Sequence, residues 1–327
     1  MKVRKFGNTD RMVSEIGLGC WQLGGDWGRI DDYTAQKVME AAVENGISFF
    51  DTADAYGGGR SEKLLYKYLK PLAPESFIAT KLGRFEGPDG LDKFSFDDFR
   101  RFTENSLKRL GVEVLDLTQL HCFPTGMMKK GEVFDWLRKL KQEGKIRSFG
   151  ASVESVEEAE LCLEQEGLDS LQIIFSIFRQ KPITSIFDQA RDKGVALIIR
   201  LPLASGLLAG RMHAGMSFPE SDHRHFNSDG QCFNVGETFA GIPFKTGLEL
   251  LDELKTLVPG GLNLAQMALR WILDYDAVTV VIPGSKTPGQ VPENASASQL
   301  APLPEALHEQ LNRFYHERVA RHIRGKY

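Results

Sequence analysis

The chain has 327 residues, of which 42% are hydrophobic and 26% are charged, and its formal net charge is -4. This length and composition exclude a minimal domain and a disordered chain, and they suit one large α/β barrel of ~250 residues plus insertions. The slight negative charge argues against nucleic acid as a main partner, and no apolar run approaches the ~18 residues of a membrane helix.

Short β-rich segments alternate along the chain with amphipathic helical segments. The predicted strands cover residues 16–20, 47–52, 77–82, 114–121, 146–152, 170–176, 195–201 and 278–284. The predicted helices cover residues 32–45, 99–110, 133–143, 156–166, 183–193 and 264–275, and an extra C-terminal helix covers 305–318. Several strands are almost continuously apolar, which is typical of parallel strands covered on both faces. Eight such repeats predict a (β/α)8 TIM barrel, with residues 1–327 forming a single domain.

Two segments depart from this alternation. Residues 202–243 form a long loop after the seventh strand, and a loop of this length in a compact domain is usually functional. Residues 3–6 and 12–14 have strand character and predict a hairpin that plugs the barrel floor.

Four polar side chains are expected at the mouth of this barrel. Asp51, Lys81 and His121 end the second, third and fourth strands, and Tyr56 lies in the loop after the second strand. In (β/α)8 barrels the active site is built at the C-terminal ends of the strands. Each residue alone is more typical of a loop salt bridge or of packing, but their convergence on neighbouring strands favours a shared chemical role.

These four residue types suit the reduction of a carbonyl group. The phenol of Tyr56, with an ordinary pKa of ~10, would give a proton to the forming alkoxide if a nearby ammonium lowered its pKa. Lys81 would supply that ammonium, and Asp51 would neutralise and orient it. His121 would hydrogen-bond and polarise the carbonyl oxygen.

At these residues the chain resembles the aldo-keto reductase family. The similarity rests on four stretches in the family's order, at residues 51–62, 105–121, 144–152 and 282–286, and it extends from about residue 5 to residue 294. The resemblance implies the family's catalytic tetrad, here Asp51, Tyr56, Lys81 and His121.

Hydride transfer also requires a carrier, because protein side chains cannot supply a hydride. The usual dinucleotide fingerprint is absent, since Gln22 stands where the third glycine after Gly17 and Gly19 belongs. Residues 284–287 lead instead into a helix N-terminus after the last strand, a common phosphate site in barrels. Lys286 there would bind the adenosine 2′-phosphate, although a solvated loop lysine is the alternative. We therefore predict NADPH as cofactor, with NADH possible.

The resemblance implies further cofactor-binding residues. Gln290 stands where many members carry Arg, which keeps NADH open, and Val153 stands where Asn is usual. The expected set lies after the strands that line the barrel mouth: Gly19, Trp21, Ser152, Gln172, Leu203, Ser205, Leu207, Gly284, Ser285, Lys286, Gln290, Glu293 and Asn294.

Arg200 stands where many members stack Tyr or Trp on the nicotinamide. Because a guanidinium stacks poorly on an oxidised, positively charged ring, we expect Arg200 to favour reduced cofactor, or to meet an acidic substrate group or a nearby carboxylate.

Aromatic residues are expected to rim a partly apolar substrate pocket. Trp21, Trp27 and Phe123 are the main candidates, with Phe226 of the long loop, whereas Phe85 and Phe233 are more typical of packing.

No metal site is expected. His213, His223 and His225 lie in the long loop, and the His-x-His pair at 223 and 225 could bind a metal, but no carboxylate or third ligand is spaced around that pair as a site needs. The cysteines match no zinc pattern and residues 1–5 begin no signal peptide, so we expect reduced thiols in a cytoplasmic protein.

Three functions follow from these observations. The first is NADPH-dependent reduction of an aldehyde or ketone, with a small-molecule carbonyl compound as substrate. The second is a polyol or sugar dehydrogenase that uses NAD or NADP in the oxidative direction. The third is a nucleotide-sensing subunit without significant turnover, against which the complete tetrad argues.

Overall fold

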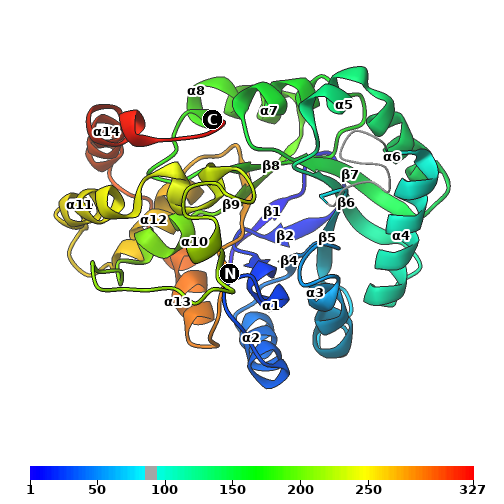
Figure 1. Cartoon of the computed structure of the whole chain (residues 1–327), viewed down its shortest axis with the longest axis horizontal. Helices are drawn as coiled ribbons and strands as arrows, with labels where there is room; N and C mark the ends of the chain where they lie inside the picture. Colours follow the sequence, from blue (N-terminus) through cyan, green and yellow to red (C-terminus); the bar gives the residue numbers. More distant parts are fainter. Residues whose placement is uncertain (85–93) are drawn as a thin grey trace.

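A computed structural model describes residues 1–84 and 94–327. Eight parallel strands, neighbours in chain order, form the barrel wall (Figure 1). They are β3 (Leu18–Gly19), β4 (Phe49–Asp51), β5 (Phe77–Leu82), β6 (Leu115–His121), β7 (Ile146–Ser152), β8 (Ser170–Ile174), β9 (Ala196–Arg200) and β10 (Val278–Val281). Parallel bridges join Ile16 to Val281 and Gly19 to Gly284, so the first and last strands meet. The predicted (β/α)8 barrel is confirmed.

Helices surround this wall (Figure 1). The longer ones are α2 (Asp32–Glu44), α4 (Phe96–Leu110), α6 (Glu132–Gln142), α7 (Val156–Leu163), α9 (Phe187–Lys193), α11 (Phe244–Lys255), α12 (Leu264–Leu273) and α14 (Glu305–Phe314). Local signals start and stop them: Ser95 and Asp98 form a capping box on α4, and Gly111 ends it with a φ of 61°. The predicted extra C-terminal helix is α14, which continues into a π-helical turn, η6 (Tyr315–Val319).

The sequence analysis predicted no helix at residues 60–69 or at residues 244–255, where the structure has α3 with η1 and α11. The helix α3 (Arg60–Leu64) continues into the π-helical turn η1 (Leu65–Leu69). Its buried face includes the polar residues Ser61 and Glu62, so the sequence lacks the apolar spacing that is typical of an amphipathic helix. The α11 helix buries Leu250, Leu251 and Leu254, a recognisable helical spacing just after the long loop.

The hairpin predicted at the floor is present. The strands β1 (Val3–Lys5) and β2 (Met12–Ser14) pair antiparallel. Phe6, just after β1, is fully buried, and its ring centroid lies 4.7 Å from that of Phe77 and 5.8 Å from that of Phe49. The floor of the barrel is therefore closed by packed aromatic rings.

The barrel interior changes from apolar to polar along β4 and β9. Alternate side chains of a strand face the same side. Phe49 and Asp51 of β4 follow this spacing, as do Ile198 and Arg200 of β9, and in both pairs the first residue belongs to the buried lower core. Hydrophobic packing therefore supports a layer of polar groups at the mouth.

The long loop is ordered by short helical turns. It contains η2 (Ala204–Ala209), α10 (His223–Phe226), η3 (Val235–Glu237) and η4 (Phe239–Gly241), drawn in yellow-green beside β9 in Figure 1. Ala204, Ser205, Phe239 and Ala240 adopt φ values of 47° to 59°, which is unfavourable for residues with a Cβ. Such strain persists only where surrounding contacts enforce it, and it often marks functional sites.

Short helices complete the connections. They are α1 (Trp21–Gly24), α5 (Thr125–Lys130), α8 (Pro182–Ser185) and α13 (Gln290–Ser296), with 3₁₀ turns η5 (Ala297–Gln299) and η7 (Ala320–His322). Among the described residues, none of these or the longer helices has the length and apolar character to cross a membrane.

Candidate active site

The structure brings Asp51, Tyr56, Lys81 and His121 together at the mouth of the barrel. The Nζ atom of Lys81 donates hydrogen bonds to Asp51 Oδ1 at 2.6 Å, to Tyr56 Oη at 3.1 Å and to the Thr52 carbonyl at 2.8 Å. The rings of Tyr56 and His121 meet edge to face, with centroids 5.7 Å apart. The strand register explains this arrangement, because adjacent parallel strands place their ends side by side.

Glycines position Tyr56. Gly57 has a φ of 60°, and a Cβ at that residue would lie 2.3 Å from the Gly24 carbonyl oxygen. Only glycine permits this conformation and this close approach. The loop after β4 is thus pressed against α1, and this contact holds the Tyr56 ring beside Trp21, with centroids 6.1 Å apart.

The charge state of the site follows from burial and pairing. Burial disfavours the ammonium of Lys81, but Asp51 and Tyr56 more than offset this effect, so the pKa of Lys81 is raised. Burial raises the pKa of Tyr56 to about 12; Lys81 opposes this rise and Asp51 adds to it. The expectation of a lowered Tyr56 pKa therefore does not hold for the net shift. The ammonium acts in the expected direction, but loss of solvation outweighs it.

His121 is neutral at physiological pH. Burial, followed by the positive charges of Arg84, Lys81 and Arg200, holds the pKa of His121 well below 6.5. The Nη1 atom of Arg84 lies 3.3 Å from His121 Nε2. A neutral imidazole carries one N–H and can donate it to an oxygen without adding a second full charge beside Lys81. A guanidinium only donates, so Nε2 is the acceptor while it bonds Arg84, and it donates to a substrate oxygen only in the tautomer that protonates Nε2.

Residues of β7 and β8 extend the network. Gln172 Nε2 donates to Asp51 Oδ2 at 2.7 Å, and Ser152 Oγ donates to Gln172 Oε1 at 3.3 Å. The predicted nicotinamide-binding pair is therefore connected to Asp51. Gln172 lines the cavity described next, whereas Ser152 is fully buried behind it.

A cavity of about 160 Å³ opens beside Tyr56 and Asp51. It runs from Gln172 and Arg200 toward the segment after β10. Many of the predicted cofactor- and substrate-binding residues line it: Gly19, Trp21, Trp27, Gln172, Arg200, Leu203, Ser205, Gly284, Lys286 and Gln290. Other lining residues, including Gln22, Pro202 and Arg224, were not predicted as part of the site.

Two basic side chains, Lys286 and Arg224, line one end of the cavity. The Lys286 ammonium donates to the Trp27 carbonyl, and Gln290 Oε1 accepts from the backbone N–H of Lys286 at 2.7 Å. Arg224 is bound by Asp222 at 2.6 Å, and its guanidinium lies 5.0 Å from the Trp27 ring centroid. Arg224 was not predicted because the flanking histidines were considered only as metal ligands.

Other predicted cofactor residues lie behind the cavity wall. Ser285 and Asn294 are buried and joined by a 3.3 Å hydrogen bond, and Leu207 belongs to the hydrophobic core. Glu293 forms an ion pair with Arg211 at 2.8 Å. The structure thus gives these four residues contacts within the protein.

Arg200 meets a carboxylate, one of the roles expected for it. Its Nη1 atom lies 2.9 Å from Oε2 of Glu237, a residue of the long loop. Arg84 binds the other oxygen of Glu237 at 2.9 Å. Although burial raises the pKa of Glu237, Arg84 and Arg200 lower it to about 2, so this carboxylate stays ionised. Neither Arg84 nor Glu237 was predicted from the sequence, because nothing in the spacing connects the two.

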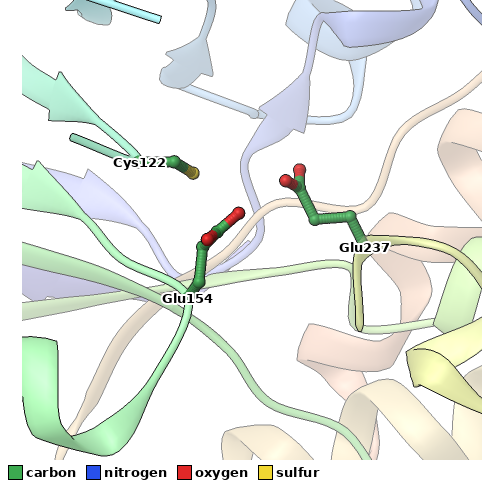
Figure 2. A group of neighbouring side chains, drawn as sticks. All are labelled: Cys122, Glu154 and Glu237. Atoms are coloured by element: carbon green, nitrogen blue, oxygen red, sulfur yellow. The ribbon is translucent and has the colours of Figure 1, made fainter. Parts of the chain in front are cut away.

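Cys122, Glu154 and Glu237 form a compact group (Figure 2). Their side-chain ligand atoms lie within 4.8 Å of one another. However, Arg84 and Arg200 donate to Cys122 Sγ at 3.5 and 3.4 Å, so two guanidinium groups already face this cluster. Burial and the neighbouring Glu237 raise the pKa of Glu154 to about 7.

Aromatic rings surround the cavity entrance. Trp21 contacts Trp27 edge to face at 5.5 Å between centroids, and Phe233 at 6.0 Å. Phe226 in turn contacts Phe233 at 6.2 Å. Phe123 lies elsewhere: its buried ring packs against Phe94 and Phe99 at 4.7 and 5.7 Å, and it does not line the described cavity. Phe85 lies outside the described residues.

Comparison with known proteins agrees with this geometry. A model described as the aldo/keto reductase family matches residues 15–316. The aldo-keto reductase YhdN of Bacillus subtilis is 30% identical over 304 residues, covering 89% of this chain and 87% of the relative. The NADH-specific methylglyoxal reductase of Escherichia coli is 27% identical over 318 residues, covering 91% of this chain and 93% of that protein.

A solved structure has the same architecture. The glycerol dehydrogenase from Gluconobacter oxydans superposes with a TM-score of 0.78 at 28% identity, covering 98% of this chain and 96% of the other. The barrel, the four polar residues at its mouth and these similarities lead to one conclusion. The chain belongs to the aldo/keto reductase family, whose members are NAD(P)H-dependent oxidoreductases acting on carbonyl compounds and alcohols.

Proposed function

We propose that this protein reduces an aldehyde or ketone to an alcohol with NADPH. The observation that carries the proposal is the hydrogen-bonded chain from Tyr56 Oη to Lys81 Nζ and Asp51 Oδ1, beside the neutral His121. This arrangement supports three roles: Tyr56 as proton donor, Lys81 as the charge that stabilises the resulting phenolate, and His121 as hydrogen-bond donor to the substrate oxygen.

The residues of the cavity fit a dinucleotide. At one end of the cavity lie Gln172 and Tyr56, which both belong to the hydrogen-bond network of Asp51 and Lys81. At the other end, Lys286 and Arg224 provide positive charge suited to phosphate. Within residues 1–84 and 94–327, Gln22 Oε1 and Arg200 Nε are buried without a hydrogen-bond partner, so polar groups remain to be satisfied. The bound cofactor supplies the hydride.

The side chains of the protein would carry out the proton transfer. Tyr56 Oη donates its proton to the substrate oxygen as negative charge develops there. Lys81 stabilises the phenolate that remains, and Asp51, held by Gln172, keeps the ammonium oriented. Trp21 and Trp27 line the cavity beside Tyr56, and their apolar rings would lower the local dielectric constant and so strengthen each electrostatic interaction.

Two observations bear on cofactor and direction. Both Lys286 and Arg224 line the cavity, which supports a cofactor with an extra phosphate, although a relative is named as NADH-specific. The likeness to a glycerol dehydrogenase favours the reverse reaction as second candidate. Tyr56 would serve both directions, but reduction starts from the protonated phenol, the form that a pKa raised to about 12 by burial favours. Reduction is therefore the direction we propose.

The test is to follow nicotinamide absorbance with NADPH and NADH across aldehydes, ketones, sugars and polyols. We expect aldehydes or ketones with NADPH to give the highest kcat/KM at pH 7. Turnover restricted to polyols with oxidised cofactor would instead establish the second candidate.

A further inference from the structure

Arg84, which follows β5, lies between the proposed reaction position and a buried carboxylate. Its Nη1 atom is 3.3 Å from His121 Nε2, and its Nη2 atom is 2.9 Å from Glu237 Oε1. The guanidinium carbon lies 5.0 Å from the centroid of Phe233, a ring that also contacts Trp21. The proposed reduction uses His121 and leaves this adjacent cation without a role.

Arg84 is the accessible member of its ionic group. Its side chain is 21% exposed, compared with 9% for Arg200 and 1% for Glu237. Because Arg84 Nη1 lies 3.3 Å from His121 Nε2, a small molecule whose carbonyl oxygen contacts His121 would have its neighbouring atoms close to Arg84. Arg200 also lines the cavity, but its side chain is less exposed and its Nη1 atom is bound to Glu237 at 2.9 Å.

The charges in this region do not balance. Two guanidinium groups share the single ionised carboxylate of Glu237. Glu154, whose pKa is raised to about 7 by burial and Glu237, remains largely protonated below neutral pH. Lys326 Nζ lies 3.9 Å from Glu154 Oε2 but is paired more closely with Glu158 Oε1, at 3.0 Å, so it adds no net charge here. Excess positive charge in a partly desolvated site is stabilised by an anion.

We propose that Arg84 selects carbonyl substrates that carry a carboxylate close to the reacting carbonyl group. The planar guanidinium matches carboxylate geometry, and charge-assisted hydrogen bonds are the stronger kind. This inference rests on the proposed carbonyl reduction and adds a substrate class to it. Arg84 would bind the carboxylate while Tyr56 and His121 contact the carbonyl oxygen.

Matched pairs of substrates test the inference. Glyoxylate and succinic semialdehyde are compared with their methyl esters, which keep the aldehyde and remove the charge. For Arg84→Met, we expect the ratio of kcat/KM for acid over ester to fall roughly 10- to 100-fold, mainly through KM of the acid. Arg84→Lys, which keeps the charge but not the planar fork, should retain part of the ratio. Arg101→Met, at a 54% exposed position on α4, is the control and should leave the ratio unchanged.

A binding measurement separates this inference from the proposed function. Oxamate and the neutral oxamide are titrated with and without cofactor, using tryptophan fluorescence, because Trp21 and Trp27 line the cavity. We expect oxamate to bind more tightly than oxamide in the wild type and this preference to disappear in Arg84→Met. Equal binding of the two, or an equal loss for acids and esters in Arg84→Met, would overturn the assignment. Absence of any carbonyl turnover would refute the reduction, and the titration would still decide the role of Arg84.

Discussion

Two ionic groups share the mouth of this barrel but are built differently. The tyrosine group (Asp51, Tyr56, Lys81) has one cation and one anion, with side-chain exposures of 0% for Lys81 and 3% for Asp51. The arginine group (Arg84, Arg200, Glu237) has two cations on one carboxylate, and Arg84 is partly exposed. A balanced, sealed pair suits the control of one proton, whereas an unbalanced and accessible group suits attraction of an anion.

The two groups also differ in which parts of the chain position their side chains. Asp51 and Lys81 come from adjacent strands whose register brings them together. Glu237 comes from the long loop, and its carboxylate is bound at the barrel mouth by Arg84 and Arg200. Ser205 Oγ donates to the Glu237 carbonyl at 3.0 Å and accepts from the Phe239 N–H at 3.1 Å, which reinforces this attachment. The arginine group therefore also fastens the loop over the site.

The largest expected effect is in the tyrosine group. Tyr56→Phe removes the proposed proton donor and should lower kcat roughly 10²- to 10⁴-fold, while NADPH affinity changes by no more than about twofold. Steady-state kinetics and fluorescence titration measure the two quantities. Tyr66→Phe, at a 52% exposed position, is the control. Near-normal turnover in Tyr56→Phe would show that the tyrosine group does not carry the chemistry.

Breaking the arginine group should act on stability. Glu237→Ala leaves two guanidinium groups without their shared carboxylate, and removing one partner of a buried ionic group typically costs ~3–5 kcal/mol. Urea denaturation measures the free energy of unfolding. Glu249→Ala, at an exposed position on α11, should stay within ~0.5 kcal/mol of wild type. A similarly small effect for Glu237→Ala would mean that the loop is held by its apolar contacts.

The pH dependence of stability sharpens the comparison. The pKa of Glu154 is about 7 in the folded protein against an ordinary 4.5, so the folded state binds the proton more tightly than the unfolded state. The protonated Glu154 contributes its full stabilisation below pH 4.5, and this stabilisation is lost as the pH rises through 7. Between pH 4.5 and pH 7 the free energy of unfolding falls by at most ~1.4 kcal/mol for each pH unit. Glu237 opposes ionisation of Glu154, whereas Arg84, Arg200 and the nearby Lys326 favour it.

Glu154→Gln removes this titration. We expect the variant to lose less stability between pH 5 and pH 8 than the wild type and to be the more stable protein at pH 8. Thermal unfolding across that range provides the measurement. Parallel curves for the two proteins would show that Glu154 titrates normally.

The smallest effect is expected at the far end of the cavity. Lys286→Ala and Arg224→Ala should each weaken NADPH about tenfold more than NADH, because each removes a charge that the extra phosphate would meet. Fluorescence titration with both cofactors gives the two dissociation constants. Equal losses would assign both residues to loop structure, where Lys286 binds the Trp27 carbonyl and Arg224 binds Asp222.

Much of the fold and part of the site were predictable because they depend on short-range patterns. The alternation of strands and helices, the floor hairpin and the polar residues at strand ends all follow from local periodicity and from the geometry of parallel barrels. Asp51, Lys81 and His121 met as expected because each ends a strand. The α3 helix was missed because its buried face carries Glu62, which binds Arg109 at 2.5 Å through a contact that sequence spacing does not reveal.

The sequence by itself determined the barrel, the neighbouring strand ends and the proximity of Tyr56 to Lys81, since the alternation of strands with helices and the glycine-permitted turns are local patterns. Tertiary structure decided the remainder. It brought Glu237 across from the long loop to Arg84 and Arg200, placed Phe123 in the core, and raised the Tyr56 pKa through burial. These outcomes depend on packing and desolvation between segments far apart in the chain, and no local pattern of residues encodes them.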